Sequence, residues 1–223
     1  MNYRPVEPEE AAQAETRQEL LKAAMEVFAE RGFRNATIRE ICQRAGANIA
    51  AVNYHFGDKE SLYAVVVKEA YRLAEEKYPP EFSLPPRPTA EQRLHAFVRS
   101  FLLRTLSEGP HAYHGKLLAR ELVEPSPALD SMVEENLLPM ASGLFAIVRD
   151  LLGRKASQEL VRNCGLSVAS QIVFYHHCQP VLKRMFPDLK NYTEAEIERL
   201  AGHITDFSLA AIKKLASKEV PRR

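Results

Sequence analysis

A short segment near the N-terminus carries the side chains best suited to chemistry with a polyanion. Between Arg31 and Lys59 the chain has five basic residues and two acidic ones, a local excess of +3. Lysine and arginine neutralise phosphates and release counterions, which gives salt-sensitive affinity for nucleic acid without reading its sequence. Asn53 lies in the same segment, and its amide can form hydrogen bonds with a base edge. The segment therefore combines residues that position a nucleic acid with one that can specify its sequence.

The chain as a whole lacks this electrostatic signal. Its 223 residues have a formal net charge of only +1 and a hydrophobic content of 46%, which fits one helical body with a small accessory domain. The first residues are polar and acidic, and charges interrupt the later apolar stretches. We therefore expect no secretory signal, no membrane partner and a soluble, cytoplasmic protein. The cysteines Cys42, Cys164 and Cys178 form no CxxC pair and are expected to be reduced, buried thiols.

The elements that must position the basic segment are helices. Apolar residues recur at steps of three and four along nearly the whole chain, and no alternating run suggests a strand, so the predicted fold class is all-α. The first helix is expected to begin at about Thr16 and to end at Gly32, which suits a left-handed C-terminal cap. Thr37 and Asn48 are expected to cap two short helices joined by a sharp turn at Gly46. Two short helices with a tight turn predict a helix-turn-helix.

The second short helix is expected to have two distinct faces. Val52 and Phe56 are spaced to point into the core of the small domain, which leaves the other side chains for the opposite or flanking faces. Asp58 can cap a fourth helix, whose apolar pattern ends before a proline-rich stretch starting at Tyr78. The further helix starts that we expect lie at Thr89, Ser126, Ser157 and Thr193.

This pattern predicts two domains and their connections. Breaks or kinks are expected at Pro139 and Pro180, which interrupt helical patterns farther along the chain. The predicted segments are a flexible N-terminal arm at 1–14, a helix-turn-helix domain at 15–76 with its motif at about 37–56, a proline-rich linker at 77–88, an effector-binding and dimerisation domain at 89–217, and a tail at 218–223.

The segment from Asn35 to Tyr63 resembles the DNA-binding domain of the TetR family. The resemblance is carried by the threonine cap, the Ala-Gly turn, the aromatic cluster that ends the second short helix and the lysine that opens the next. It covers about the first third of the chain. Asn48 stands where the family usually has serine or threonine, and Asn53 where it often has tyrosine. The resemblance implies a three-helix N-terminal domain that binds double-stranded operator DNA.

We expect the residues of this domain to divide their roles on DNA. Asn53 is the candidate for a base edge, and the apolar side chains that precede it suit close approach to thymine methyl groups. The resemblance assigns the cationic, hydroxyl and aromatic residues to the DNA backbone. The alternative is that the aromatic residues only pack the small domain and the charges form a solvated face. The predicted DNA-binding residues are Thr37, Arg39, Arg44, Asn48, Ile49, Ala50, Ala51, Asn53, Tyr54, His55 and Lys59.

The C-terminal part resembles regulators of the CecR type, most visibly from Ala119 to Pro127 and from Leu137 to Pro139. In the TetR family the last two long helices of each subunit form a four-helix dimer interface, so the resemblance implies a homodimer. A plain core face within one subunit would use the same residues. The predicted interface residues are Ile197, Leu200, Ala201, Ile204, Ser208, Ala211, Ile212 and Leu215.

A pocket for an unidentified small-molecule effector is expected in the same domain. Its richest candidate cluster precedes Pro180, where a broken helix would leave backbone carbonyls unpaired beside titratable and aromatic side chains. The predicted pocket residues are Phe101, Arg104, Tyr113, Met140, Phe145, Phe174, Tyr175, His176, His177 and Cys178.

These patterns predict a repressor that an effector releases from its operator, with no cofactor and no metal. A metal-responsive regulator is the alternative suggested by His111 and His114 and by the adjacent His176, His177 and Cys178. A second alternative is an architectural DNA-binding protein without an effector. An enzyme is not expected, because the sequence has no glycine-rich phosphate loop, nucleophile elbow or HExxH motif.

Overall fold

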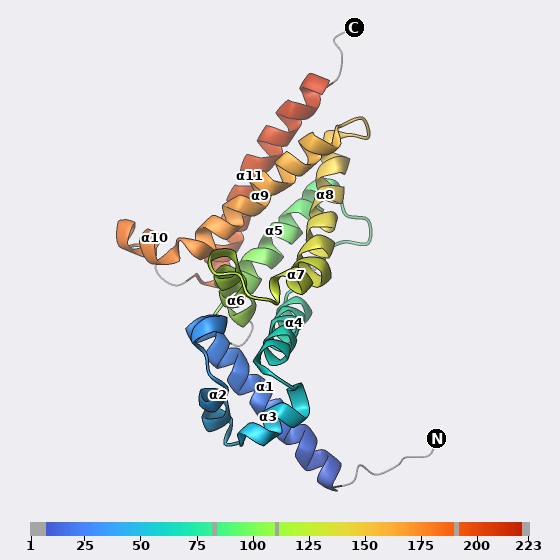
Figure 1. Ribbon diagram of the computed structural model, residues 1–223. Helices are drawn as coiled ribbons and strands as arrows, with labels where there is room; N and C mark the ends of the chain where they lie inside the picture. Colours follow the sequence, from blue (N-terminus) through green and yellow to red (C-terminus); the bar gives the residue numbers. More distant parts are fainter. Residues whose placement is uncertain (1–7, 82–83, 110–111, 190–191, 220–223) are drawn as a thin grey trace.

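The structure is a computed structural model that describes residues 8–81, 84–109, 112–189 and 192–219 (Figure 1). These residues contain helices and no strand, which confirms the predicted all-α class. The elements are α1 (Pro8–Asn35), α2 (Ile38–Ala45), α3 (Ile49–Phe56), α4 (Lys59–Lys77), α5 (Ala90–Leu106), α6 (Tyr113–Val123), α7 (Leu129–Met132), a π-helical turn η2 (Val133–Leu137), α8 (Leu138–Leu152), α9 (Gln158–His177), α10 (Gln179–Met185) and α11 (Glu194–Glu219).

The small domain formed by α1 to α4 lies at one end of the molecule (Figure 1). Its caps are the predicted ones: Thr37 Oγ1 accepts from the Glu40 amide at 3.1 Å, Asn48 Oδ1 from the Ala51 amide at 2.9 Å, and Asp58 Oδ1 from the Ser61 amide at 2.7 Å. Each bond satisfies an amide that the first turn of a helix leaves free.

Glycines shape two of the turns in this domain. Gly46 adopts a left-handed φ of 64°, which allows the sharp turn between α2 and α3. Gly32 has a φ of 76° and interrupts α1, after which the chain makes a last helical turn to Asn35. Both positions are disfavoured for residues with a Cβ atom, so the predicted breaks are confirmed.

The first helix begins earlier than predicted. It starts at Pro8, not at about Thr16, so residues 8–14 of the expected flexible arm are helical. Proline fits the first turn because its missing N–H has no partner there, and Glu9 and Glu10 favour the positive end of the helix dipole. These polar turns lack an apolar stripe, so the spacing of apolar residues does not indicate that they are helical.

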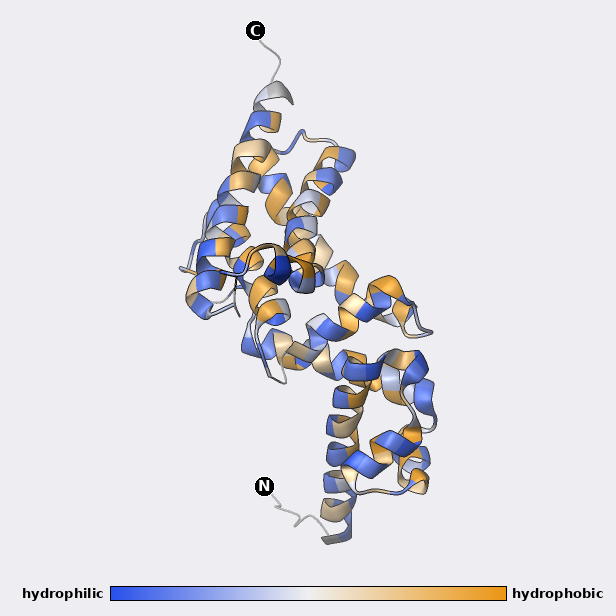
Figure 2. Ribbon diagram, turned by 90° about the vertical axis from the view of Figure 1, so that its left-hand side faces the viewer, coloured by the Kyte–Doolittle hydropathy of each residue, from blue (hydrophilic) through white to orange (hydrophobic). Residues whose placement is uncertain are grey.

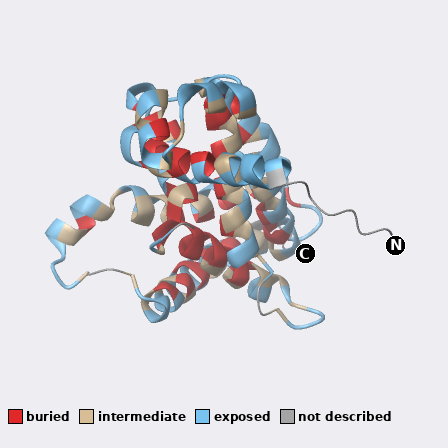
Figure 3. Ribbon diagram, turned by 90° about the horizontal axis from the view of Figure 1, so that it is seen from below, coloured by how far each residue is buried: buried red, intermediate tan, exposed pale blue. Residues whose placement is uncertain are grey.

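The larger body is built mainly from α5, α8, α9 and α11 (Figure 1). Their apolar sides face one another, and the buried residues gather inside the body (Figures 2 and 3). The predicted capping boxes at Thr89 and Thr193 form, and Ser157 caps α9. Ser126 precedes α7 by three residues, so that helix begins slightly later than expected.

Pro180 lies at a break between two helices, whereas Pro139 lies in a helical run that continues from α7 through η2 into α8. Pro139 occupies the first turn of α8, directly after η2, and Pro180 occupies the first turn of α10. At this break the Phe174 carbonyl accepts from the Cys178 amide at 2.9 Å, and the Cys178 carbonyl accepts from the Leu182 amide at 2.8 Å. Within the described residues, every helix is too short or too polar to cross a membrane.

Candidate DNA-binding surface and effector cleft

Helix α3 presents one face to solvent. Val52 and Phe56 are buried as predicted, whereas 53% of Ile49 and 72% of Tyr54 are exposed. Asn53 is also exposed. Helix α3 therefore exposes apolar and aromatic side chains together with the amide of Asn53. Such a surface can contact base edges in the major groove.

The N-terminal turns of α1 brace this face. The Tyr54 hydroxyl lies 3.4 Å from Gln13 Oε1, and the Arg17 guanidinium lies 5.1 Å from the centre of the Phe56 ring. A hollow of about 520 Å³ separates the two helices, and His55 borders it together with Asn48 and Ala51. The turns that were predicted to be part of a flexible arm therefore help to orient the exposed helix.

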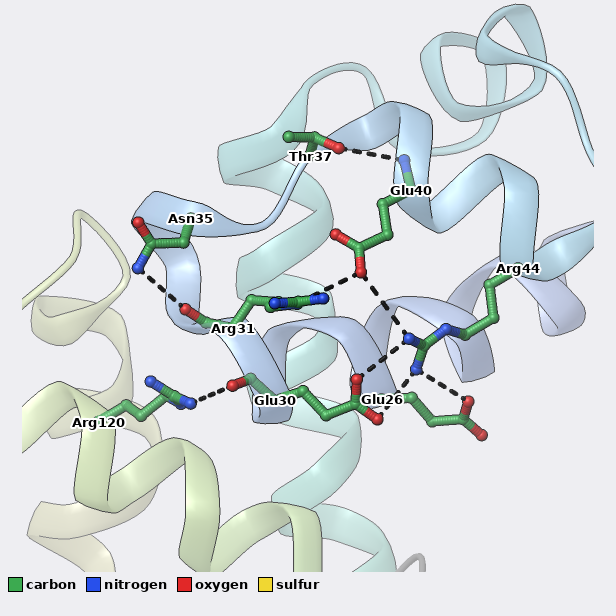
Figure 4. A network of polar contacts seen from close by, with 8 residues as sticks. All are labelled: Glu26, Glu30, Arg31, Asn35, Thr37, Glu40, Arg44 and Arg120. Carbon is green, nitrogen blue, oxygen red and sulfur yellow. Dashed lines mark hydrogen bonds and ion pairs between the residues drawn. The ribbon is translucent and has the colours of Figure 1, made fainter.

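Arg44, a predicted contact to the DNA backbone, is engaged with carboxylates within the protein. Its guanidinium forms two hydrogen bonds of 3.1 Å with the two carboxylate oxygens of Glu30, and it lies 3.6 Å from Glu26 and 3.8 Å from Glu40 (Figure 4). The Arg44 hydrogen bond lowers the pKa of Glu30. The carboxylates of Glu26 and Glu30 neutralise the Arg44 guanidinium. Because both carboxylates belong to α1, Arg44 joins α2 to α1.

The charge count in the sequence missed Glu26 and Glu30 because these two partners precede the segment. From Glu26 to Lys59 there are five basic and four acidic residues, an excess of +1 in place of +3. Arg39 differs from Arg44, because it is exposed and has no ion pair with any residue that the structure describes. Arg39 is therefore a cation of this surface without a carboxylate partner among the described residues.

Lys59 caps the end of the first helix. Its ammonium group donates to the Arg34 carbonyl at 3.3 Å and lies 4.7 Å from the centre of the Phe33 ring. Burial lowers its pKa. This geometry gives Lys59 a role in joining α4 to α1, beside the contact with DNA backbone that the sequence predicted.

Helix α6 ties the small domain to the larger body. The Arg120 guanidinium donates to the Ala29 carbonyl at 3.0 Å and to the Glu30 carbonyl (Figure 4). Glu121, only 1% exposed, accepts from the Tyr63 hydroxyl at 2.7 Å and from the Ser126 amide at 3.0 Å. Burial and the hydrogen bond to Glu121 raise the pKa of Tyr63. The sequence signal for this junction is the adjacent charged pair Arg120 and Glu121 among the apolar residues of α6.

A cleft of about 580 Å³ lies where α4, the proline-rich segment, α5 and α8 meet. This volume suits a drug-sized molecule. Met140 is the predicted pocket residue that lines it. The lining residues are Tyr71, Glu75, Pro79, Pro80, Glu81, Leu84, Arg93, Phe97, Pro139, Met140, Gly143, Ala146 and Ile147.

The other predicted pocket residues from α5, α6 and α8 do not line this cleft. Phe101 belongs to the buried core, and Phe145 packs on α9 so closely that a Cβ atom at Gly165 would lie 2.5 Å from it. Tyr113 lies near α1, where the charges of Glu26 and Glu30 add to the burial that raises its pKa. Arg104 is buried one layer behind the cleft wall.

The cluster at the end of α9 is also dispersed. His176 Nε2 lies 2.9 Å from the Gly115 carbonyl, whereas Phe174 and His177 are exposed. Tyr175 borders a separate hollow of about 450 Å³ beside α11, and Cys178 is half-buried at the helix break. Adjacent residues on a helix point in different directions, so sequence proximity did not create one site.

The residues predicted to form the dimer interface belong mostly to the core of one subunit. Ile197, Ala201, Ile204, Ser208 and Ile212 are buried, Leu200 and Leu215 are half-buried, and Ala211 is exposed. The alternative of an intrasubunit core face therefore describes most of them. Among the described residues, the large apolar side chains exposed on α9 and α11 are Leu166, Phe174 and Phe207.

The alternative of a metal-responsive regulator has no assembled ligand cluster within the part of the chain that the structure describes. Among the described residues, no group of three or more His, Cys, Asp or Glu side chains is placed to hold a metal ion. His111 lies outside the described residues. Cys42 and Cys164 are buried free thiols, as expected, and Cys178 is a half-buried one.

Family models match both parts of the chain. Residues 20–66 match the model described as bacterial regulatory proteins of the tetR family. Residues 90–212, more than half of the chain, match the model of the C-terminal domain of the HTH-type transcriptional dual regulator CecR.

Curated relatives include proteins that align beyond the first domain. The dual regulator CecR of Shigella flexneri is 30% identical over 151 residues, which are 64% of this chain and 67% of CecR. The repressor NicS of Pseudomonas putida is 28% identical over 170 residues, 72% of this chain and 76% of NicS. The repressor AcnR of Corynebacterium glutamicum is 43% identical over 61 residues, which span only 32% of AcnR.

Solved structures share the fold. The transcriptional regulator FadR from Bacillus subtilis, solved in complex with stearoyl-CoA, has a TM-score of 0.63 at 16% identity and covers 86% of this chain and 97% of its own. A regulatory protein of the tetR family from Rhodococcus RHA1 has a TM-score of 0.64 at 19% identity, with coverage of 88% and 96%.

Proposed function

The chain belongs to the TetR family of bacterial transcription regulators, with a C-terminal domain of the CecR type, and on this premise we propose that it is a homodimeric repressor which a small-molecule effector releases from operator DNA. Members of this family regulate transcription and are not enzymes. The proposed base-reading residues are Asn53 with Ile49, Ala50 and Ala51. The proposed backbone contacts are Arg39, Tyr54, His55 and Lys59.

One observation carries this proposal: a single helix reaches both the exposed helix α3 and the cleft. The first turn of α4 follows α3 directly, and Asp58 caps it. Near its other end, Tyr71 and Glu75 line the cleft. A molecule that changes the position of α4 at the cleft therefore moves the surface that enters the major groove.

The contacts of α6 support the same coupling. Arg120 holds α1 and Glu121 holds Tyr63 of α4, so both long helices of the small domain are attached to the body at one place. A dimer reads two half-sites at fixed spacing, and a small rotation of each domain about this attachment alters that spacing. The effector releases DNA only if it binds the DNA-incompetent arrangement more tightly.

The proposed dimer uses the solvent-facing sides of α9 and α11. Exposed Leu166, Phe174 and Phe207 lie on the two long helices that the family uses for dimerisation, and large exposed apolar side chains favour a partner surface. Light scattering of the protein tests this. We expect a dimer, and we expect Phe207→Glu to give monomers, whereas Phe186→Glu at the C-terminal cap of α10 keeps the dimer.

The decisive experiment is fluorescence anisotropy with DNA that flanks the gene for this protein. We expect one dimer to bind this duplex more tightly than a scrambled duplex and to weaken as salt rises. Compounds that raise the melting temperature of the protein are then added to the complex, and we expect some to release the DNA. Equal weak binding to both duplexes, or operator binding that no stabilising compound changes, would favour the architectural alternative.

A further inference from the structure

We propose that the effector is a small amphipathic carboxylate, whose carboxylate takes the place of Glu75 beside the buried Arg104 while its apolar part fills the cleft. This inference rests on the proposed function, because it names the chemical class of the ligand for the same cleft. It is carried by an incompletely satisfied cation directly behind the cleft wall.

Arg104 is almost completely buried, with 2% of its surface exposed. Its Nε atom donates to the Tyr78 carbonyl at 2.9 Å, but Nη2 has no hydrogen-bond partner among the described residues. The nearest carboxylate oxygen, Oε1 of Glu75, lies 3.5 Å from Nη2, which is too far for a good hydrogen bond. A buried guanidinium without full hydrogen bonding is costly, so an acceptor at normal distance would be favourable.

Glu75 occupies the route from the cleft to Arg104. It lines the cleft, its side chain is 44% exposed, and it also accepts from the Tyr71 hydroxyl at 3.3 Å. A carboxylate with this exposure can move into water at small cost. A ligand carboxylate that enters by the same route would find the Tyr71 hydroxyl and the Arg104 guanidinium as its donors.

A second unsatisfied group lies on the far side of Tyr71. His114 packs edge-on against the Tyr71 ring with a centroid distance of 5.2 Å, and its buried Nε2 atom has no partner among the residues described. Burial, followed by the charge of Arg104, lowers the pKa of His114 to about 3, so the imidazole is neutral. It therefore adds a polar neighbour without a competing charge.

The remaining charges near the cleft are largely matched. Arg93 is paired with Asp150 at 2.5 Å, and Glu81 is exposed at the edge. The rest of the lining is mostly apolar, with Phe97, Met140 and Ile147 among its members. Such a lining suits an apolar body that carries one anionic group, because affinity comes from apolar burial and orientation from a few polar contacts.

The same replacement would act on α4. Arg104 holds both Glu75 and the carbonyl of Tyr78, which are the last turn and the C-terminal cap of that helix. When the ligand takes the place of Glu75, α4 loses its ion pair to α5. The ligand carboxylate would therefore favour a different position of α4, the helix that follows α3.

The test uses carboxylates with different apolar bodies: octanoate, 4-phenylbutanoate and 2-naphthoate. Their amides are the uncharged controls, and octyltrimethylammonium is the cationic one. Binding to the full-length dimer is measured by calorimetry, and release of operator DNA by anisotropy. We expect at least one carboxylate to bind at least about tenfold more tightly than its amide, as a charge-assisted hydrogen bond requires.

Two variants of α4 locate the effect. Glu75→Gln removes the competing carboxylate and should tighten carboxylate binding by about threefold or more. Glu76→Gln, at an exposed neighbour paired with Arg72 at 2.8 Å, should leave carboxylate affinity unchanged. Arg104→Lys keeps the charge but loses the planar fork, and should weaken carboxylate binding; if it fails to fold, Glu75→Gln still decides.

The inference is wrong if no carboxylate of the panel binds, or if the amides bind as tightly as the carboxylates. It is also wrong if octyltrimethylammonium binds most tightly and loses affinity in Glu75→Gln. These results are distinct from failure of the proposed function. A protein that binds its operator and is released only by uncharged or cationic compounds remains an effector-controlled repressor with another ligand class. A protein that prefers no operator fails the proposed function whatever it binds in the cleft.

Discussion

The small domain and the larger body differ in how far apart in the chain their functional residues lie. The exposed face of α3 is formed by residues that lie close together in the chain, between Asn48 and His55, and the caps in this domain bond residues three positions apart. The cleft instead draws its wall from α4, the proline-rich segment, α5 and α8. The contrast teaches that a surface built by one helix can be predicted from sequence, whereas a cavity depends on how several helices pack.

The largest expected effect comes from breaking the junction between the two regions. Glu121→Ala leaves the buried Tyr63 hydroxyl and the half-buried Ser126 amide without their acceptor, which should lower the free energy of unfolding by about 3 kcal/mol. Urea unfolding of the dimer measures this. The control is Glu124→Ala at the C-terminal cap of the same helix, where loss of an exposed pair with Arg34 should cost less than about 1 kcal/mol. Equal losses in the two variants would mean that the junction contributes no special stability.

The second effect belongs to the body alone and depends on pH. The folded pKa of His114 is about 3, below the ordinary value of 6.5, so the unfolded chain binds more protons between these values. Stability is then fully present above about pH 6.5 and decreases as the pH falls towards 3. From pH 7 to pH 5 the His114 contribution should fall by about 2 kcal/mol.

Urea unfolding at a series of pH values measures this dependence. His114→Gln should flatten part of the slope, whereas His177→Gln, at an exposed position, should keep it. His176, whose pKa burial also lowers, supplies a remaining slope of the same sign. An unchanged slope in His114→Gln would show that His114 is charged or solvated in the folded protein.

Particular residues show what sequence could and could not predict. Thr37 and Asn48 were predicted correctly because a cap depends only on the next few residues. Ile204 was placed in the dimer interface because periodicity shows that a helix has an apolar face, but not whether that face meets its own subunit. Glu75 was missed because nothing in the sequence of α4 shows that its side chain lies beside Arg104 of α5.

A third prediction tests the reading face of the small domain. Asn53→Ala removes the amide proposed to contact a base edge, so preference for operator over scrambled DNA should fall by about tenfold. Lys59→Ala should weaken binding to both duplexes alike, because its proposed contact is with the backbone. Anisotropy titrations with the two duplexes measure both ratios. Equal changes of preference in the two variants would contradict this division of roles.

The smallest expected effect separates two arginines that look equivalent in sequence. Arg39 is exposed and unpaired within the described residues, so Arg39→Gln should remove one phosphate contact and reduce the slope of log affinity against log salt by about 1. Arg44 is held by Glu30 and its neighbours, so Arg44→Gln should leave that slope unchanged and lower the free energy of unfolding by about 1 kcal/mol.

Affinities measured over a range of salt concentrations, together with urea unfolding, distinguish these outcomes. If Arg44→Gln reduces the salt slope as Arg39→Gln does, then Arg44 leaves its carboxylate partners when DNA binds, and even the locally determined domain rearranges at its target. If only Arg39→Gln reduces the salt slope, a basic residue contributes to DNA binding only where the fold leaves it without a carboxylate partner. The sequence segment alone cannot show this, because Glu26 and Glu30 lie in the preceding helix.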